Sequence, residues 1–227
     1  NTHQAITVNL DSCINCNLCV QACREVQVND VIGMAYRGSK SKIIFDFDSE
    51  LGESTCVSCG ECVQVCPTGA LMESNLLNKS NVREHYPDRS VDTLCPYCGV
   101  GCQTNVKVKG NKIISIDGRD GPSNESRLCV KGRFGFDYIS HPDRLLTPLI
   151  RIDKNTKSFD LKIDNSNIKD YFREASWEEA LSSAAKNLKE TSDQYGGKSI
   201  AGFGSAKCSN EEAYLFQKLI RQGFISN

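Results

Sequence analysis

Twelve of the thirteen cysteines in this chain stand in three tight groups, and thiolates grouped in this way bind metals. Three thiolates close together in sequence can cap three corners of one iron–sulfur cube from a single wrapped loop. The first two groups share the spacing C-x2-C-x2-C-x3-C, the second 43 positions after the first: Cys13, Cys16, Cys19 and Cys23, and then Cys56, Cys59, Cys62 and Cys66. This spacing favours clusters over disulfides, which are typical of short, evenly paired secreted domains.

The fourth cysteine of each run is too close in sequence to reach the same cube comfortably. In two-cluster ferredoxins the fourth cysteine ligates the other cluster. The spacing therefore predicts two crossed ligand sets: Cys13, Cys16, Cys19 and Cys66 for one cluster, and Cys56, Cys59, Cys62 and Cys23 for the other. Pro67 follows Cys66 as this pattern requires, whereas Arg24 follows Cys23 and departs from it. Structural zinc is the alternative, but its two ligand pairs usually stand about a dozen or more residues apart.

The third group has three cysteines on a glycine-rich loop and one remote cysteine. Gly99 and Gly101 allow the backbone to approach an inorganic core closely. Zinc is a stronger rival here, because both metals use C-x2-C, yet three near ligands and one distant ligand are less usual for zinc. We therefore predict a third 4Fe–4S cluster on Cys95, Cys98, Cys102 and Cys129.

The other candidate residues carry weaker signals. Lys131 lies two residues beyond Cys129, and by itself it is typical of a solvated lysine. Cys208 stands alone, which favours a small buried apolar side chain over a ligand or nucleophile. The histidines are scattered and are expected at surface or structural positions: His3, His85 and His141.

Local patterns predict the elements that position these groups. Residues 43–48 alternate apolar and polar side chains up to Phe47, which indicates a strand. Residues 106–116 place two valines before Gly110–Asn111 and two isoleucines after it, which predicts a β-hairpin.

The last sixty residues are patterned as an α/β segment. Ser176 with Glu179, and Ser209 with Glu212, indicate capping boxes at the starts of two amphipathic helices that end near glycines. Residues 199–203 (SIAGF) are expected to form a short strand between these helices, and a helix–strand–helix order implies a parallel sheet that only begins here.

Composition excludes several classes of function. Twenty-seven basic residues balance twenty-eight acidic ones in 227 residues, which gives no electrostatic footprint for nucleic acid or an anionic membrane surface. No apolar run approaches the roughly 20 residues needed to span a bilayer. The first residues lack the features of a signal peptide, and grouped thiols suit a reducing compartment, so we expect a cytoplasmic protein. The chain begins with Asn1 rather than Met, which suggests a fragment.

The expected fold class is α+β, in three domains and a linker. Residues 1–73 form a two-cluster 4Fe–4S ferredoxin-type domain, and 74–91 form a polar linker. Residues 92–147 form a small β-rich 4Fe–4S domain, and 148–227 form the incomplete start of an α/β domain. Residues 153–170 are expected to be an exposed polar excursion.

The order of these motifs resembles that of the molybdenum or tungsten bis-pterin oxidoreductases. The two-cluster module, CPYCGVGC at 95–102 and CVKGR at 129–133 carry this resemblance. Within the family the chain is similar to the catalytic (alpha) subunit of formate dehydrogenase, as in ACREVQVNDVIGMAYRG, TCVSCGECVQVCPTGAL, FGFDYISHPDRLLTPLIR and SAKCSNEEAYLFQKLIR. The resemblance covers 5–224 and thins across 153–175.

The resemblance implies bis-molybdopterin guanine dinucleotide, with molybdenum or tungsten, beside the third cluster. It implies that Lys131 bridges that cluster and the pterin as an electron relay. It also implies formate oxidation to CO2, with electrons passing to iron–sulfur and flavin- or NAD-binding partner subunits and on to NAD. The family's metal-ligating cysteine or selenocysteine follows the segment that matches 213–224, so we expect no catalytic residue in this fragment and no formate oxidation by it alone.

Other functions remain open on the sequence. A stand-alone iron–sulfur electron-transfer protein would not need residues 199–222. Another bis-pterin oxidoreductase, such as a nitrate reductase, and the large iron–sulfur subunit of an NADH dehydrogenase fit less well with the directly fused two-cluster module and VQVNDVIGMAYRG. An iron-only hydrogenase would not need CVKGR beside a third cluster.

Overall fold

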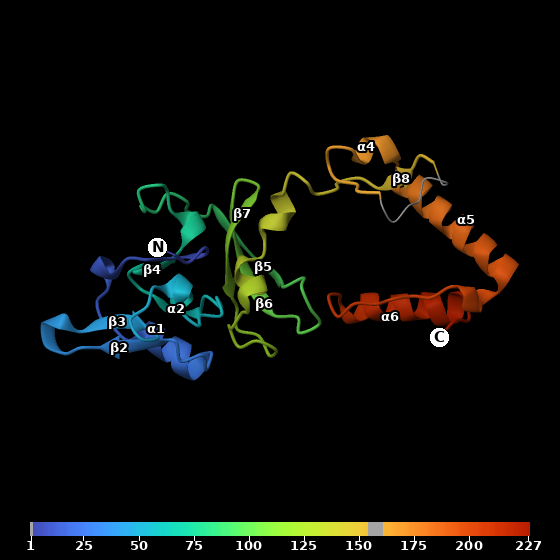
Figure 1. Cartoon of the computed structure of the whole chain (residues 1–227). Coiled ribbons are helices and arrows are strands. Elements are labelled where there is room, and N and C mark those ends of the chain that lie inside the picture. Colours follow the sequence, from blue (N-terminus) through green and yellow to red (C-terminus); the bar gives the residue numbers. More distant parts are fainter. Residues whose placement is uncertain (1, 154–160) are drawn as a thin grey trace. The chain divides into compact units, whose positions relative to one another are not determined.

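The computed structural model describes residues 2–153 and 161–227, which fall into two compact units (Figure 1). Unit 1 is Asn1–Asp137 and unit 2 is Tyr138–Asn227. Helices and strands occur in both units, so the expected α+β class is confirmed. Part of the polar excursion expected at 153–170 lies outside the described residues.

Unit 1 is built from short strands and short helices. Its strands are β1 (Ile6–Val8), β2 (Ile32–Ala35), β3 (Lys42–Phe45), β4 (Leu71–Glu73), β5 (Arg89–Leu94), β6 (Gln103–Lys109) and β7 (Lys112–Gly118). Its helices are α1 (Leu18–Gln21), which continues into a π-helical turn (Ala22–Val26), α2 (Glu61–Val65) and α3 (Val130–Phe134). Single 3-10 turns lie at Leu10–Ser12, Gly38–Lys40, Leu51–Glu53 and Ser74–Leu76.

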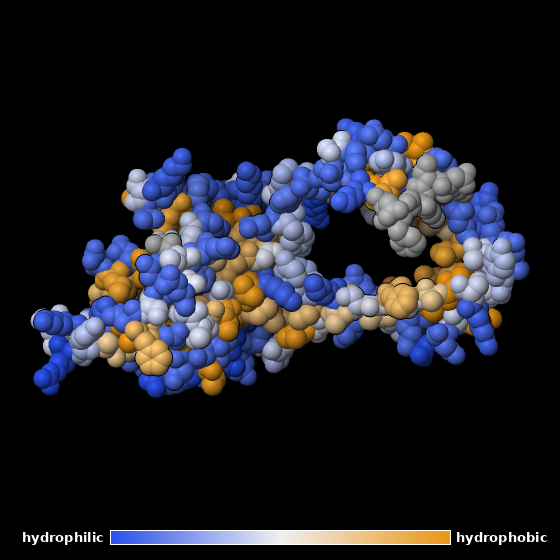
Figure 2. Space-filling model, viewed as in Figure 1, coloured by the Kyte–Doolittle hydropathy of each residue, from blue (hydrophilic) through white to orange (hydrophobic). Residues whose placement is uncertain are grey.

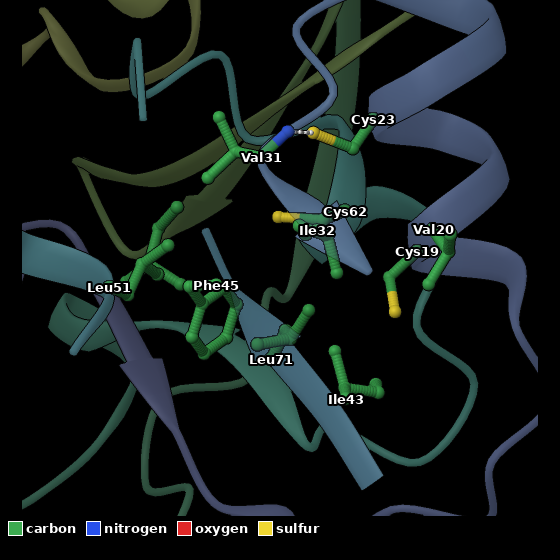
Figure 3. Packing of buried hydrophobic residues seen from close by; sticks show 11 residues of the cluster. Cys19, Val20, Cys23, Val31, Ile32, Ile43, Phe45, Leu51, Cys62 and Leu71 are labelled. Atoms are coloured by element: carbon green, nitrogen blue, oxygen red, sulfur yellow. Dashed lines mark hydrogen bonds between the residues drawn. The ribbon is translucent and has the colours of Figure 1, made fainter. Parts of the chain in front are cut away.

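Two antiparallel strand pairs frame the first two cysteine runs. β1 pairs with β4, which places Ile6 opposite Glu73, and β2 pairs with β3, which places Ile32 opposite Phe45. Figure 3 shows the buried core between them, where thiols lie among aliphatic and aromatic side chains. The core contains Ile6, Cys19, Val20, Cys23, Val31, Ile32, Ile43, Phe45, Leu51, Cys62 and Leu71. Burial of these apolar groups stabilises the region that holds the thiols.

The strand predicted at residues 43–48 ends earlier than expected. Asp46 and Asp48 have φ angles of 47° and 69°, in the left-handed region, so the chain turns after Phe45. The Asp46 carboxylate accepts a hydrogen bond of 2.7 Å from the backbone N–H of Thr55. The Phe47 side chain is therefore fully exposed instead of continuing the buried face.

A three-stranded antiparallel sheet, in the order β5-β6-β7, follows in unit 1. The hairpin predicted across Gly110–Asn111 is confirmed, because β6 and β7 pair with Val106 opposite Ile116. Gly110 has a φ of 58°, which a glycine adopts at little cost. No sequence pattern predicted β5, because its six residues are all exposed and show no buried face.

Unit 2 holds a further strand pair and the two longest helices of the described chain. β8 (Leu149–Arg151) pairs antiparallel with β9 (Phe172–Glu174), next to α4 (Ile168–Tyr171). The helices α5 (Trp177–Tyr195) and α6 (Asn210–Lys218) follow, separated by a 3-10 turn (Gly197–Ser199), and a π-helical turn (Leu219–Gly223) extends α6.

One of the two predicted capping boxes is complete. At α6, Ser209 accepts from the N–H of Glu212, whose carboxylate accepts from the N–H of Ser209. At α5, Ser176 accepts from the N–H of Glu179 as predicted, but the Glu179 carboxylate pairs with Arg173 instead of returning to the cap. The second half of that box was wrong because a nearby cation binds the carboxylate more strongly than a backbone N–H does.

The strand expected at residues 199–203 is wrong, since the described chain has no strand there. A strand needs a hydrogen-bonded neighbouring strand, and no strand of the described chain pairs with residues 199–203. Ile200 is buried, whereas Phe203 is 94% exposed. Apolar side chains also lie exposed on α6 and on the π-helical turn that extends it, among them Leu215 and Leu219, and Figure 2 shows apolar atoms in this part of unit 2. Across the described residues, every helix is too short or too polar to cross a bilayer.

Candidate iron–sulfur sites

The backbone around the first two cysteine groups repeats as closely as the sequence does. Asn15 and Asn17 have φ angles of 55° and 67°, and their counterparts 43 positions on, Ser58 and Gly60, have 56° and 73°. These left-handed residues curl the chain, so that successive cysteines turn toward a common centre. The curl therefore belongs to both loops, although only one of its four positions is a glycine.

Backbone N–H groups point at sulfur atoms in both loops. The N–H of Asn15 donates to Cys13 Sγ at 3.4 Å, and the N–H of Ser58 donates to Cys56 Sγ at 3.3 Å. Such donors stabilise thiolate charge, and hydrogen bonds to sulfur tune the reduction potential of a cluster. These contacts fit ligation by cysteine sulfur.

The structure places Cys66 with the first loop. Burial, together with the nearby Cys13, Cys66 and Cys16 thiols, raises the pKa of Cys19 to about 11. Four thiols from the two runs thus lie close enough to interact electrostatically. They are three members of the first run and the last member of the second.

The structure places Cys23 with the second loop in the same way. Burial raises the pKa of Cys56 and of Cys59, and Cys23 adds to the shift of both. One small pocket is lined by all four of these thiols, Cys23, Cys56, Cys59 and Cys62. Figure 3 shows the Cys23 sulfur accepting from the N–H of Val31 at 3.3 Å.

The third group lies where β5 turns into β6. The N–H of Cys95 donates to the carbonyl of Cys102 at 2.8 Å, which closes the turn, and Gly101 has a φ of 64°. Burial raises the pKa of Cys95, and electrostatic interactions with the nearby Cys129 and Cys98 thiols contribute to the rise. The remote cysteine therefore lies with the other three.

The Asn124 side chain holds the loop that precedes Cys129 by hydrogen bonds to backbone groups. Asn124 is buried, and its Oδ1 accepts from the N–H of Gln103 at 2.9 Å. Its Nδ2 lies 3.1 Å from three carbonyl oxygens, those of Gln103, Arg119 and Arg127. Asn124 thus ties the strand after Cys102 to the loop before Cys129. The backbone carbonyl of Cys129 in turn accepts from the N–H of Arg133, in the first turn of α3.

These donor sets fit iron–sulfur clusters. Every cysteine is a free thiol, and sulfur is the ligand atom that such clusters use. Among the described residues, no three His, Cys, Asp or Glu side chains converge on a single-ion position. A hollow of about 510 Å³ also lies between the second and third groups, bordered by Cys59, Cys102 and Cys129.

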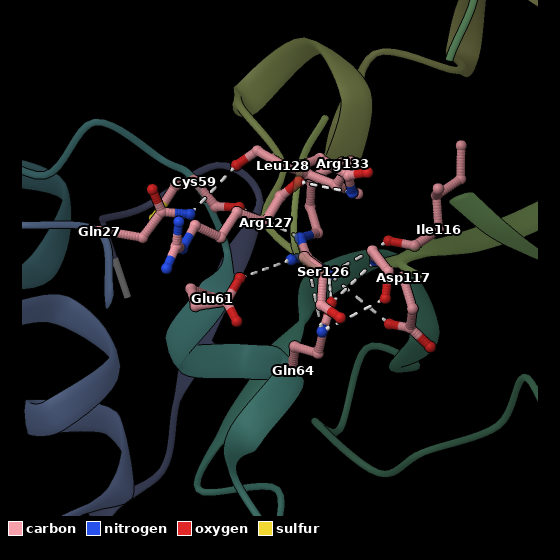
Figure 4. Close-up of polar contacts among 12 residues, drawn as sticks. Gln27, Cys59, Glu61, Gln64, Ile116, Asp117, Ser126, Arg127, Leu128 and Arg133 are labelled. Carbon is pink, nitrogen blue, oxygen red and sulfur yellow. Dashed lines mark hydrogen bonds and ion pairs between the residues drawn. The ribbon is translucent and has the colours of Figure 1, made fainter. Parts of the chain in front are cut away.

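Arg133 is a site residue that the sequence analysis missed. Its side chain is completely buried, and Nε donates to the backbone carbonyl of Cys59 at 3.1 Å (Figure 4). Nη1 donates to Gln64 Oε1 at 2.6 Å, and Nη2 donates to Glu61 Oε2 at 3.3 Å. Burial raises the pKa of Glu61 more than the nearby Arg133 lowers it.

The same guanidinium also reaches the β5-β6-β7 sheet. Nη1 donates to the carbonyl of Ile116 at 3.3 Å and lies 3.6 Å from Asp117 Oδ1. Gln64 adds a parallel link, because its Oε1 accepts from the N–H of Gly118 at 2.9 Å. The only signal for Arg133 in the sequence was its place in CVKGR, because its partners stand up to 74 residues away.

The weaker candidates have simpler surroundings. Lys131 is exposed on α3, two residues from Cys129. Cys208 is only half-buried, and its thiol donates to the carbonyl of Ser205 at 2.9 Å. His3 has a structural role, since its Nδ1 accepts from the N–H of Ile6 at 3.0 Å and its Nε2 lies 3.0 Å from Ser58 Oγ.

Comparison with known sequence families places these thiol groups in recognised domains. Residues 12–70 match the 4Fe-4S dicluster domain, and 88–141 match the molybdopterin oxidoreductase Fe4S4 domain. Residues 144–227 match the molybdopterin oxidoreductase family itself. Fold and site thus define an iron–sulfur protein of the oxidoreductase class.

Individual relatives agree with these matches. The chain is 34% identical over 97% of its length to "Probable oxidoreductase YjgC" of Bacillus subtilis (strain 168). It is 33% identical over 96% of its length to "Putative formate dehydrogenase SH0748" of Staphylococcus haemolyticus (strain JCSC1435). It covers 24% of each of these relatives, or about a quarter of their length. The chain belongs to the molybdopterin oxidoreductase family.

Proposed function

We propose that this chain is the electron-relay part of a formate dehydrogenase catalytic subunit. The observation that carries the proposal is the presence, within unit 1, of three groups of four thiols ahead of a molybdopterin oxidoreductase segment. Relatives that bear the name formate dehydrogenase supply the substrate. Because the chain covers about a quarter of their length, formate oxidation is proposed for the complete subunit.

Three ligand sets hold the proposed clusters. Cluster A is bound by Cys13, Cys16, Cys19 and Cys66, cluster B by Cys56, Cys59, Cys62 and Cys23, and cluster C by Cys95, Cys98, Cys102 and Cys129. One ligand of cluster A, Cys19, and one of cluster B, Cys62, are buried, whereas Cys16 of cluster A is exposed. Cys98 and Cys129 are exposed, which leaves one side of cluster C open to a neighbouring group.

When bound, a bis-molybdopterin guanine dinucleotide with molybdenum or tungsten oxidises formate to CO2, and 4Fe–4S clusters carry the two electrons away singly. Lys131 is exposed and two residues from Cys129, and its ammonium can donate hydrogen bonds to a pterin. Its positive charge raises the potential of the adjacent cluster. The proposed partners are iron–sulfur and flavin- or NAD-binding subunits that reduce NAD, in the cytoplasm.

The proposal is tested on the complete, anaerobically prepared subunit. We expect about twelve iron atoms in the residues equivalent to this chain, four for each cluster. Formate should transfer electrons to these clusters, and rapid-freeze spectra should show the clusters in their reduced state. About three zinc atoms without visible absorbance would overturn the cluster assignment, and full iron content without reduction by formate would overturn the substrate.

Lys131 has its own test in the same preparation. Lys131→Ala should keep iron and pterin content while slowing the formate-driven reduction of clusters A and B by at least about tenfold. Lys131→Arg should recover part of the rate, because a planar guanidinium does not replace a compact ammonium at one contact point. Lys112→Ala, at an exposed lysine of β7, is the matched control. Unchanged kinetics in Lys131→Ala would leave Lys131 as a solvated surface residue.

A further inference from the structure

Arg133 joins two proposed cluster sites through one buried side chain. Its backbone N–H donates to the carbonyl of Cys129, a proposed ligand of cluster C, at 3.1 Å. Its Nε donates to the carbonyl of Cys59, a proposed ligand of cluster B, at 3.1 Å. One residue therefore contacts the peptide groups of ligands from both sites.

The cluster B loop is shaped to receive this side chain. Gly60 lies between Cys59 and Cys62 with a φ of 73°, and a Cβ at this position would lie 2.8 Å from Arg133 Nε and 2.9 Å from its Cγ. Any other residue would therefore clash with the arginine as well as strain the turn. The fit is close enough that a shift of the arginine would move the loop.

The guanidinium is rigidly held and stays charged. It makes hydrogen bonds to Cys59, Gln64, Ile116 and Glu61, and these partners come from both the thiol loop and the sheet. An arginine does not lose its proton in a protein, and its planar fork fixes the direction of each bond. Its acidic partners are Glu61, which is buried, and Asp117, which is partly exposed.

We propose that Arg133 is a positioning residue that fixes the separation of clusters B and C and that its charge raises the potential of cluster B. This inference rests on the proposed cluster assignment. The covalent route between Cys59 and Cys129 is 70 residues long, whereas the route through the Arg133 side chain is a single residue. The network therefore sets the gap between the two sites.

The test uses the complete subunit with its clusters and reads two properties apart from activity. Redox titration followed by electron paramagnetic resonance gives the potential of each cluster. Spin–spin broadening between reduced clusters B and C reports their separation. The variants are Arg133→Gln and Arg133→Lys, and Arg119→Gln, which removes a partly exposed charge at the end of β7, is the control.

Arg133→Gln should lower the ratio of reduced to oxidised cluster B at a fixed potential about tenfold, which corresponds to about 59 mV for one electron. It should also weaken the broadening. Arg133→Lys keeps the charge but not the fork, so it should restore the potential and leave the broadening weak. Because Arg133→Gln could prevent assembly, Glu61→Gln provides a second measurement and should raise the potential of cluster B.

The outcomes separate this inference from the proposed function. A parent subunit without three iron clusters would overturn the proposed function, and this inference with it. A parent with three clusters, combined with Arg133 variants of parental potential and broadening, would overturn only the role of Arg133. If Arg133→Gln fails to assemble, parental values in both Arg133→Lys and Glu61→Gln would overturn it as well.

Discussion

Glu73, at the end of β4, carries a buried carboxyl group in an unfavourable environment. Its side chain is 3% exposed, and Oε2 has no hydrogen-bond partner among the described residues. Burial raises its pKa from 4.5 to about 7, and the nearby Asp117 carboxylate adds to the shift, whereas Arg133 and Arg83 oppose it. The folded protein therefore keeps a proton on Glu73 that the unfolded chain releases near pH 4.5.

This proton makes stability depend on pH. The folded state binds more protons than the unfolded state between pH 4.5 and about 7, so the free energy of unfolding falls as pH rises through this range and then levels off. Glu73→Gln should flatten that slope and stabilise the protein above pH 7 by a few kcal/mol at most. Anaerobic thermal unfolding across the range measures it, with exposed Glu84→Gln as control. Equal slopes in Glu73→Gln and the parent would contradict the prediction.

At the scale of single residues, the sequence reveals ligands far better than it reveals their supports. The twelve cysteines proposed as ligands are visible because metal ligation imposes a residue type and a local spacing. The roles of Arg133 and Glu73 could not be predicted from the sequence, because each depends on contacts with side chains and backbone groups that are remote in sequence. Glu61, for example, lies 72 positions before Arg133.

At the scale of elements, the duplicated loops exchange their last cysteine. Cys23, in the π-helical turn after α1, lines the pocket of the second loop. Cys66, directly after α2, interacts electrostatically with Cys19 of the first loop. Each helix thus spans from one thiol group to the other. Neither loop would complete a four-thiol set from its own run.

The exchange predicts which cluster a substitution damages. Cys23→Ser should impair cluster B, held by Cys56, Cys59 and Cys62, and leave cluster A largely intact. Iron content and paramagnetic resonance spectra of the reconstituted protein measure this, and Cys208→Ser, at the ungrouped cysteine, should bind as much iron as the parent. Selective loss of cluster A would show that each run binds its own cube.

Predicted helices and turns agree with the structure where the residues that form them are close together in sequence. The hairpin at Gly110–Asn111 and the capping box of α6 depend on a turn and a cap within a few residues, and both formed as predicted, while α5 formed only the first half of its box. The strand expected at 199–203 needed a distant partner strand, and β5 was recruited by its pairing with β6 in spite of its exposed pattern. Strand formation depends on neighbours that local patterns do not describe.

At the scale of the whole molecule, the grouped thiols lie in one of the two units, while large exposed apolar side chains occur in both. Unit 1 holds all the grouped thiols and most of the buried apolar side chains. Unit 2 exposes large apolar side chains on both long helices, including Trp177 and Leu181 of α5. Exposed apolar surface of this extent is typical of surfaces that pack against further protein.

This division predicts that unit 1 is sufficient for the clusters. A polypeptide of residues 1–137 should bind about twelve iron atoms after anaerobic reconstitution and give the spectra of the longer chain. It should also be more soluble, because it lacks the exposed faces of α5 and α6. Iron analysis and light scattering of the two polypeptides provide the comparison. A loss of cluster C on truncation would show that unit 2 is needed to hold it.

The hydrogen bonds of Asn124 bear on how cluster C is built. Cys129 follows Cys102 by 27 residues, and closing such a loop onto a shared centre costs about 3.5 kcal/mol of chain entropy. Asn124 already ties the two ends of this loop together through the backbone groups of Gln103, Arg119 and Arg127. In the proposed cluster C site, these hydrogen bonds share the entropy cost of closure with the metal–thiolate bonds, so the fold as well as ligation holds the remote thiol beside the three near ones.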